Sequence, residues 1–136
     1  TDATPRTITI DVSPINSAPY GTDATLSILE DGSHSFSAAD FGFSDTDDTP
    51  ANLLQSVIIT GLPANGALTF NGNPVNINDE IAVGDLANLV FTPDANAFGN
   101  GYANITFRVR DDGGTLNGGV DTDPVDNTIT FDVVEV

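Results

Sequence analysis

The chain has 136 residues, a length that suits one domain rather than two. Twenty acidic residues face three arginines and no lysine, for a formal net charge of −17 at pH 7, and there is no cysteine. This composition excludes nucleic-acid binding and docking on an anionic membrane, which need a basic surface, and it excludes disulfides, zinc–thiolate sites and thiol nucleophiles.

A strongly acidic chain with few aromatic residues can be disordered. Here hydrophobic residues make up 39% of the sequence and fall in patterned segments, so we expect a folded core. No stretch reaches the length of a transmembrane helix, and no secretory signal peptide opens the sequence.

Most of the chain has the pattern of short β-strands, in which polar and apolar residues alternate and β-branched side chains are frequent. In chain order we expect strands at residues 7–12, 24–30, 33–37, 55–60, 66–70, 74–77, 89–92, 103–110 and 128–134. Turn-forming residues separate them, among them the Asn71-Gly72 pair of a β-hairpin, and only residues 83–88 suggest a helical turn. The regular spacing predicts an all-β fold, an antiparallel β-sandwich.

Residues 7–12 (TITIDV) and 128–133 (TITFDV) are nearly identical, and they lie 121 residues apart from Thr7 to Thr128. A tandem array of repeats explains such a recurring segment, because each repeat ends with the equivalent strand before the next linker begins. We therefore expect residues 1–13 to be a terminal strand equivalent to the end of a preceding repeat. Residues 14–19 would form a linker and residues 20–136 one complete repeat. The alternative is that two Thr/Ile-rich edge strands look alike by composition.

The acidic residues gather in short loops beside strand ends, at 30–31, 45–48, 94–96, 111–112 and 121–123. Ionised carboxylates held this close together repel one another unless a cation neutralises them. Ca²⁺ is the expected ion, because it takes six to eight oxygen ligands, whereas zinc and copper favour His or Cys. An EF-hand starting at Asp45 fails, since Pro50 and Ser56 stand where Gly and Glu are required. The ligands are then non-local, or the acids serve only solubility.

No catalytic constellation emerges from the sequence. His34 is the only histidine and has no nucleophile at a recognisable spacing, and nothing selects a glycosidase pair from the carboxylates. We therefore expect a protein that is not an enzyme.

Several segments in order resemble a known family, the cadherin-like repeats of large secreted or surface RTX-type adhesins of bacteria. In chain order they are NSAP (16–19), LED (29–31), FSAADFGFSDTD (36–47), ITGLPANGAL (59–68), LVFTP (89–93), FRVRDDGG (107–114) and NTI (127–129). The resemblance spans nearly the whole unit and implies a Greek-key β-sandwich, cadherin-like or immunoglobulin-like, that binds Ca²⁺ at the junctions between repeats.

The resemblance also implies metal ligands. Asp45 and Asp47 look like an Asp-x-Asp ligand pair, Asp111 like their partner and Asn16 like a linker ligand, all at the N-terminal pole; Ser17 stands where the family usually has Asp. A second set consists of Glu30, which looks like the glutamate of the first strand, its neighbour Asp31, and Asp94 with Asn96 at the opposite pole.

The function implied is that of a calcium-binding, non-catalytic structural or adhesion repeat, in a long adhesin that is secreted or held at the bacterial cell surface. Its partners would be the adjacent repeats of the same chain, together with an extracellular polysaccharide or a host or cell surface. The alternative is a calcium-dependent polysaccharide-binding module, with Asp-rich loops beside Tyr102 holding the ion and the sugar.

Overall fold

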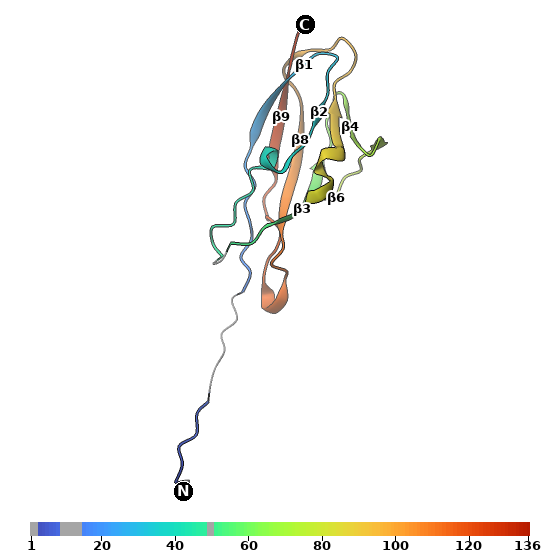
Figure 1. Cartoon of the computed structure of the whole chain (residues 1–136). Coiled ribbons are helices and arrows are strands. Elements are labelled where there is room, and N and C mark those ends of the chain that lie inside the picture. The colour runs from blue at the N-terminus through green and yellow to red at the C-terminus, as the bar shows by residue number, and fades with distance from the viewer. Residues whose placement is uncertain (1–2, 9–14, 49–50) are drawn as a thin grey trace.

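The structure, a computed structural model, describes residues 3–8, 15–48 and 51–136 and is an all-β sandwich of two sheets (Figure 1). The five-stranded sheet has the order β1-β9-β8-β3-β6, with β1 Ala24–Leu29, β9 Asn127–Val134, β8 Gly99–Asp111, β3 Leu54–Gly61 and β6 Asp79–Ala82. The four-stranded sheet has the order β2-β7-β4-β5, with β2 His34–Ser35, β7 Leu89–Thr92, β4 Ala67–Phe70 and β5 Asn73–Pro74. Three short 3₁₀ helices complete it: η1 Ala38–Phe41, η2 Val83–Asn88 and η3 Leu116–Gly118.

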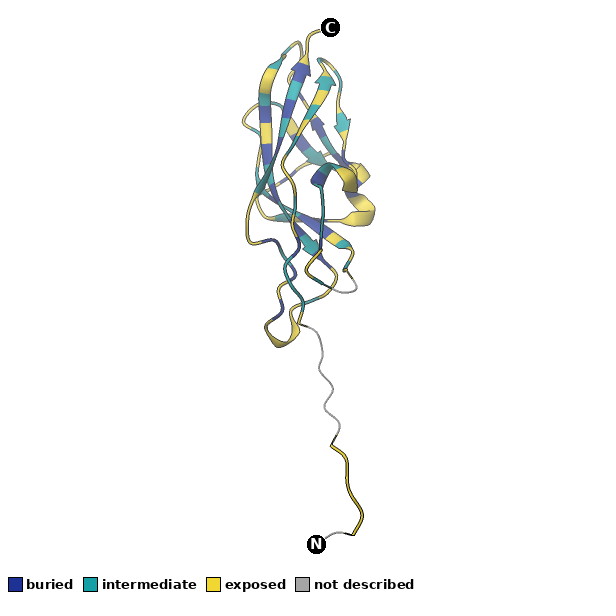
Figure 2. Cartoon of the chain, turned by 90° about the vertical axis from the view of Figure 1, so that its left-hand side faces the viewer, coloured by how far each residue is buried: buried dark blue, intermediate teal, exposed yellow. Residues whose placement is uncertain are grey.

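The core lies between the sheets and follows the alternation of the strands (Figure 2). On β8, Ile105, Phe107 and Val109 are fully buried, as their period-two spacing predicts. Phe91 of β7 stacks on Phe131 of β9, with ring centroids 4.2 Å apart, and so joins the two sheets. The all-β sandwich predicted from the sequence is confirmed, whereas its Greek-key and cadherin-like character stays a prediction.

Two expected strands are reduced to two residues each in the structure, and one further strand was not expected. The strand expected at 74–77 is shortened to Asn73–Pro74, because a turn follows in which the Asn76 N–H donates to Asp79 Oδ2 (2.8 Å). β6, which begins at Asp79, was not expected. The strand expected at 33–37 keeps only His34–Ser35, since a 3₁₀ helix starts at Ala38.

The strand expected at residues 7–12 is not tested as a whole. Thr7 and Ile8 belong to no strand, and residues 9–12 lie outside the described residues.

β1 and β9 pair in parallel, from Ala24↔Ile129 to Leu29↔Val134, whereas the sequence predicts an antiparallel arrangement throughout. Both strands run toward the same end of the sandwich, so the described chain enters at one end and leaves at the other (Figure 1). We call these ends the N-terminal pole (residues 15–20, 44–48, 51–53 and 111–123) and the C-terminal pole (residues 29–33, 93–98 and 134–136). Across the described residues, no helix is both long and apolar enough to cross a membrane.

Candidate metal site

Three carboxylates meet at the N-terminal pole. Asp45, Asp48 and Asp111 each offer an oxygen, and these oxygens lie within 4.8 Å of one another. Asp45 and Asp111 are buried, whereas Asp48 is half-buried. Among the described residues this is the one group of three acidic, histidine or cysteine side chains that is close enough to share a metal ion.

The strands explain why these side chains converge. Asp111 ends β8 on the inward-facing side of the strand, in register with Phe107 and Val109, so its carboxylate takes a place where the pattern calls for an apolar residue. Asp45 follows Ser44, whose backbone N–H and C=O both pair with Tyr20 (2.8 and 2.7 Å). Secondary structure on both sides thus positions two buried carboxylates toward each other.

Backbone and amide donors satisfy only part of the cluster. Asp45 Oδ2 accepts the Asn52 N–H (2.7 Å), and Asp111 Oδ1 accepts the Gly113 N–H (2.9 Å) and the Asn16 side-chain amide (2.8 Å). The other oxygens of the two buried residues, Asp45 Oδ1 and Asp111 Oδ2, are buried and accept no hydrogen bond from the described residues. A buried carboxylate oxygen without a partner is costly, and a cation is the usual remedy.

The electrostatics of Asp45 support this conclusion. Burial raises the pKa of Asp45 above its ordinary value, and the neighbouring Asp48 and Asp111 raise it further. Ionisation of Asp45 is therefore unfavourable next to the other two carboxylates. A bound cation would offset both the loss of hydration at Asp45 and the repulsion among the three carboxylates. The donor set is all oxygen, which fits a hard cation such as Ca²⁺ better than zinc or copper.

The linker is tied directly to this cluster. The Asn16 amide donates to Asp111 Oδ1 (2.8 Å) and to the carbonyls of Gly114 (3.0 Å) and Val120 (2.9 Å), and the Val120 N–H donates back to Asn16 O (2.9 Å). The Ser17 N–H donates to Asp48 Oδ1 (3.0 Å). Two consecutive linker residues thus bind two of the three clustered carboxylates.

Gly113 is required for this approach, because a Cβ there would collide with the side-chain amides of Asn16 and Asn52. Asn52 itself holds the cluster together, since its side-chain amide donates to Asp48 Oδ2 (3.1 Å) and to Asn16 Oδ1. A substitution at Gly113 would therefore push the linker away from the carboxylates.

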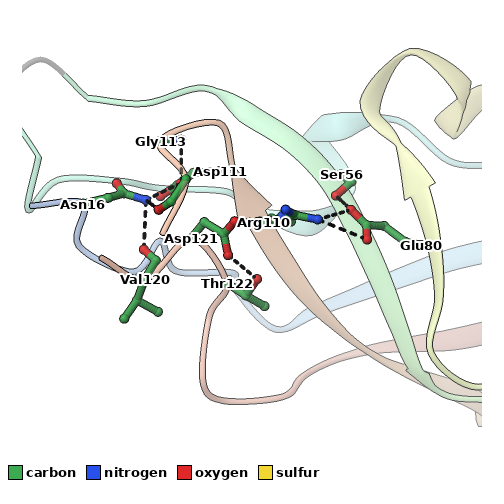
Figure 3. A network of polar contacts seen from close by, with 10 residues as sticks. Asn16, Ser56, Glu80, Arg110, Asp111, Gly113, Val120, Asp121 and Thr122 are labelled. Carbon is green, nitrogen blue, oxygen red and sulfur yellow. Dashed lines mark hydrogen bonds and ion pairs between the residues drawn. The ribbon is translucent and has the colours of Figure 1, made fainter. Parts of the chain in front are cut away.

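An ion-pair network supports the loop that follows Asp111 (Figure 3). Arg110 Nε lies 2.9 Å from Asp121 Oδ2 and its Nη1 lies 3.1 Å from Glu80 Oε2 on β6, where Ser56 also donates to Glu80. The Asp111 N–H donates to Asp121 O (2.7 Å), which closes the loop against β8. Arg110 thereby fixes the segment that supplies the carbonyls of Gly114 and Val120 to Asn16.

The structure brings together three of the residues expected as ligands at this pole, Asn16, Asp45 and Asp111, and separates the fourth. Asp47 Oδ2 instead accepts a hydrogen bond from the Tyr20 hydroxyl (2.7 Å), and this bond raises the pKa of Tyr20. Asp48 takes the place expected for Asp47. The sequence signal for this residue was the acidic loop 45–48, but which aspartate of the loop joins Asp45 in the cluster depends on a turn at residues 46–47.

The ligands expected in the second set do not converge on one point. The Asn96 N–H donates to Asp31 Oδ1 (2.9 Å) and the Val136 N–H to Glu30 Oε1 (3.1 Å), while the Tyr102 hydroxyl donates to Asp94 Oδ2 (3.2 Å). Asp31, Asp94 and Asn96 are exposed and Glu30 is half-buried. These residues line one pole, but within the described chain they do not form a cluster like that of Asp45, Asp48 and Asp111.

Comparisons of the chain with protein-family models, with curated proteins and with solved structures found no match. The site is therefore interpreted from its own geometry: a buried all-oxygen cluster, unsatisfied in part, where the linker meets the sandwich.

Proposed function

We propose that this chain is a calcium-binding, non-catalytic structural repeat of a long bacterial extracellular adhesin, of the cadherin-like kind, and that Ca²⁺ locks its linker onto the sandwich. The single observation that carries the proposal is a pair of buried oxygens, Asp45 Oδ1 and Asp111 Oδ2, in the cluster to which the linker is bound; neither has a partner among the described residues. A site for solubility alone would leave its carboxylates in water rather than bury them.

The chain's own contacts explain how an ion at this site would stiffen the junction. A bound calcium ion would supply positive charge to Asp45, Asp48 and Asp111, which otherwise repel one another. Asp111 and Asp48 are the residues that accept hydrogen bonds from Asn16 and Ser17 of the linker. Anything that holds these two carboxylates in place therefore also holds the linker at a fixed angle to the sandwich.

The rest of the proposal concerns where such a repeat works. In a tandem array, junctions stiffened in this way turn a flexible chain into a rod that projects from a secreted or surface-bound adhesin. Its partners are then the adjacent repeats of the same chain, with a polysaccharide or a host or cell surface met elsewhere in the array. We rank the alternative, a calcium-dependent polysaccharide-binding module, second: Tyr20 and Tyr102 both donate their hydroxyls to carboxylates, Asp47 and Asp94, within the chain itself.

Thermal unfolding in calcium and in excess chelator tests the proposal. An ion that binds only the folded form stabilises it by about 2.7 kcal/mol at a hundredfold excess over Kd. We expect calcium to raise the Tm by roughly 10 °C at that excess for a domain of this size. An unchanged Tm in saturating calcium contradicts the proposal.

A pair of adjacent variants separates binding at the site from a general effect of charge. Asp111→Asn removes one clustered carboxylate, whereas Asp112→Asn removes an exposed one whose Oδ1 accepts the Leu53 N–H (3.0 Å), a bond that the amide oxygen of Asn retains. Both variants lose one negative charge at neighbouring positions. We expect calcium to stabilise Asp112→Asn like the wild type and to leave Asp111→Asn nearly unchanged. Equal responses would place the ion elsewhere.

A further inference from the structure

Large hydrophobic side chains are exposed at both poles of the molecule. Leu53 (72% exposed) and Leu116 (84%) lie at the N-terminal pole, and Leu29 (60%) and Val136 (80%) lie at the C-terminal pole. Ile15 and Val120 are also exposed at the first, and Phe98 and Val134 at the second. Scattered exposed hydrophobics are normal on a protein surface, but gathered ones mark an interaction site.

At the N-terminal pole these residues lie in segments that contact Asn16 of the metal site or directly adjoin such contacts. Ile15 precedes Asn16, and the Val120 N–H donates to Asn16 O (2.9 Å). Leu53 follows Asn52, whose side chain donates to Asn16, and Leu116 O accepts the N–H of Gly119 (3.0 Å), which packs against Asn16. We call Ile15, Leu53, Leu116 and Val120 the N-terminal rim.

At the opposite pole the apolar residues belong to elements that end together. Leu29 ends β1 opposite Val134 of β9, and the Glu30 N–H donates to Val134 O (2.8 Å). Val136 is held by Glu30 Oε1 (3.1 Å), and Phe98 immediately precedes β8, whose Gly99 pairs with Val133. We call Leu29, Phe98 and Val134 the C-terminal rim.

The sequence identifies what reaches the N-terminal rim. The echo of residues 7–12 in β9 has an offset of 121 residues, which aligns Ile15 with Val136, so in an array these two are one position. In a tandem array, the last strand of a preceding copy therefore ends only a few residues before Asn16. At about 3.5 Å for each extended residue, so short a connection holds the C-terminal pole of that copy next to the N-terminal rim.

We propose that the two rims form a head-to-tail contact, in which the C-terminal rim of one copy of this chain packs on the N-terminal rim of the next copy. This inference rests on the tandem reading of the proposed function and adds an apolar interface around the metal site. The contact joins two different surfaces, so it extends into a row of units rather than closing into a dimer. Both poles are acidic, so a bound cation would reduce the repulsion between them, while the rims supply the apolar burial.

A tandem of two copies tests the contact, with residues 14–136 of the second copy placed directly after residue 134 of the first. Backbone amide and methyl chemical shifts are compared with those of the single chain, in calcium and in chelator. The informative residues are Leu29 and Phe98 of the first copy and Leu53 and Leu116 of the second, which lie far from the fusion point in the sequence. We expect all four to shift in calcium, and nuclear spin relaxation to show that the copies tumble as one body.

Variants distinguish this contact from stiffening by calcium alone. Leu53→Ser and Leu116→Ser together in the second copy should abolish the shifts at Leu29 and Phe98 while calcium still binds. The control is Ile77→Ser, an apolar residue that is 59% exposed and belongs to neither rim, and whose neighbour Asn78 donates its N–H to Ile59 O of β3 (2.6 Å).

The outcomes for the two proposals are separate. Calcium binding without shifts at Leu29 and Phe98 overturns the rim contact and leaves the metal site standing. Shifts that survive Leu53→Ser with Leu116→Ser also overturn the contact. Shifts at both rims without calcium binding support the contact and contradict the proposed function.

Discussion

Both poles are acidic, but their acidic residues differ in burial and in hydrogen bonding. At the N-terminal pole, Asp45 and Asp111 are buried side by side, and each has an oxygen that accepts no hydrogen bond from the part of the chain that the structure describes. At the C-terminal pole, Asp31 and Asn96 are exposed, both adopt a positive φ of 62°, and they hydrogen-bond to each other. Asp and Asn favour such left-handed turn positions, so their presence there is explained without an ion. The direction in which a strand end points its side chain, more than the number of acids, separates the candidate metal site from a turn.

The largest test of this contrast removes one charge from each pole. Asp45→Asn should lose the calcium stabilisation of about 2.7 kcal/mol expected at a hundredfold excess over Kd, whereas Asp31→Asn should keep it. In chelator we expect the opposite effect: Asp45→Asn should be more stable than the wild type, because it removes a buried carboxylate that its acidic neighbours repel. Denaturant unfolding in both conditions measures these differences. If Asp31→Asn lost the stabilisation by calcium and Asp45→Asn kept it, the calcium site would lie at the C-terminal pole instead.

A second test asks whether the N-terminal pole depends on the ion pairs behind it. Arg110→Ala leaves the largely buried Asp121 without its cation, and we expect unfolding to become easier by roughly 2 kcal/mol, less than for a fully buried pair because Arg110 is about a third exposed. The matched control is Arg108→Ala, whose pair with Asp126 is more exposed on both sides and should cost about 0.5 kcal/mol. Calorimetric titration should show weaker calcium binding only for Arg110→Ala. Equal affinities in the two variants would show that the loop needs no such support.

The smallest effect concerns Asp47, which lies at the N-terminal pole but outside the cluster. Its hydrogen bond and charge raise the pKa of Tyr20, so the stabilisation from this bond is present below the ordinary pKa of the phenol and is lost as pH rises through the raised value. Ultraviolet titration of the phenol should show this pKa fall in Asp47→Asn, with Tyr20→Phe identifying the signal. Calcium should leave the wild-type pKa raised; a fall with calcium would mean that Asp47 leaves Tyr20 for the ion.

The strands of the sandwich could be predicted because their pattern is local. Ile105, Phe107 and Val109 alternate with polar residues, and all three are buried in the structure. The parallel pairing of β1 with β9 could not be predicted in this way, because no local signal specifies which distant strand lies beside Ala24–Leu29. The prediction of a strand at 74–77 was wrong for a local reason. Its β-branched residues favour a strand, but a turn closed by the Asn76 N–H and Asp79 Oδ2 forms there instead.

The site was predictable in part. Asn16, Asp45 and Asp111 were expected together through the family resemblance, and the structure places them in one hydrogen-bonded group with Asn52. Asp47 was expected only through the Asp-x-Asp pair that the family resemblance implies, whereas residues 46–47 form a turn here and Asp48 joins the cluster instead. Asn52 carried no signal in the sequence, since its role depends on loops that only the fold brings together.

The parallel pairing of β1 and β9 has a mechanical consequence. Because the described chain enters at one pole and leaves at the other, tension applied between its ends runs along these two strands (Figure 1). Their ladder, from Ala24↔Ile129 to Leu29↔Val134, is then loaded in shear, so its hydrogen bonds share the force instead of opening one after another. A unit joined in this way resists pulling most strongly along the axis on which an array of such units would be stretched.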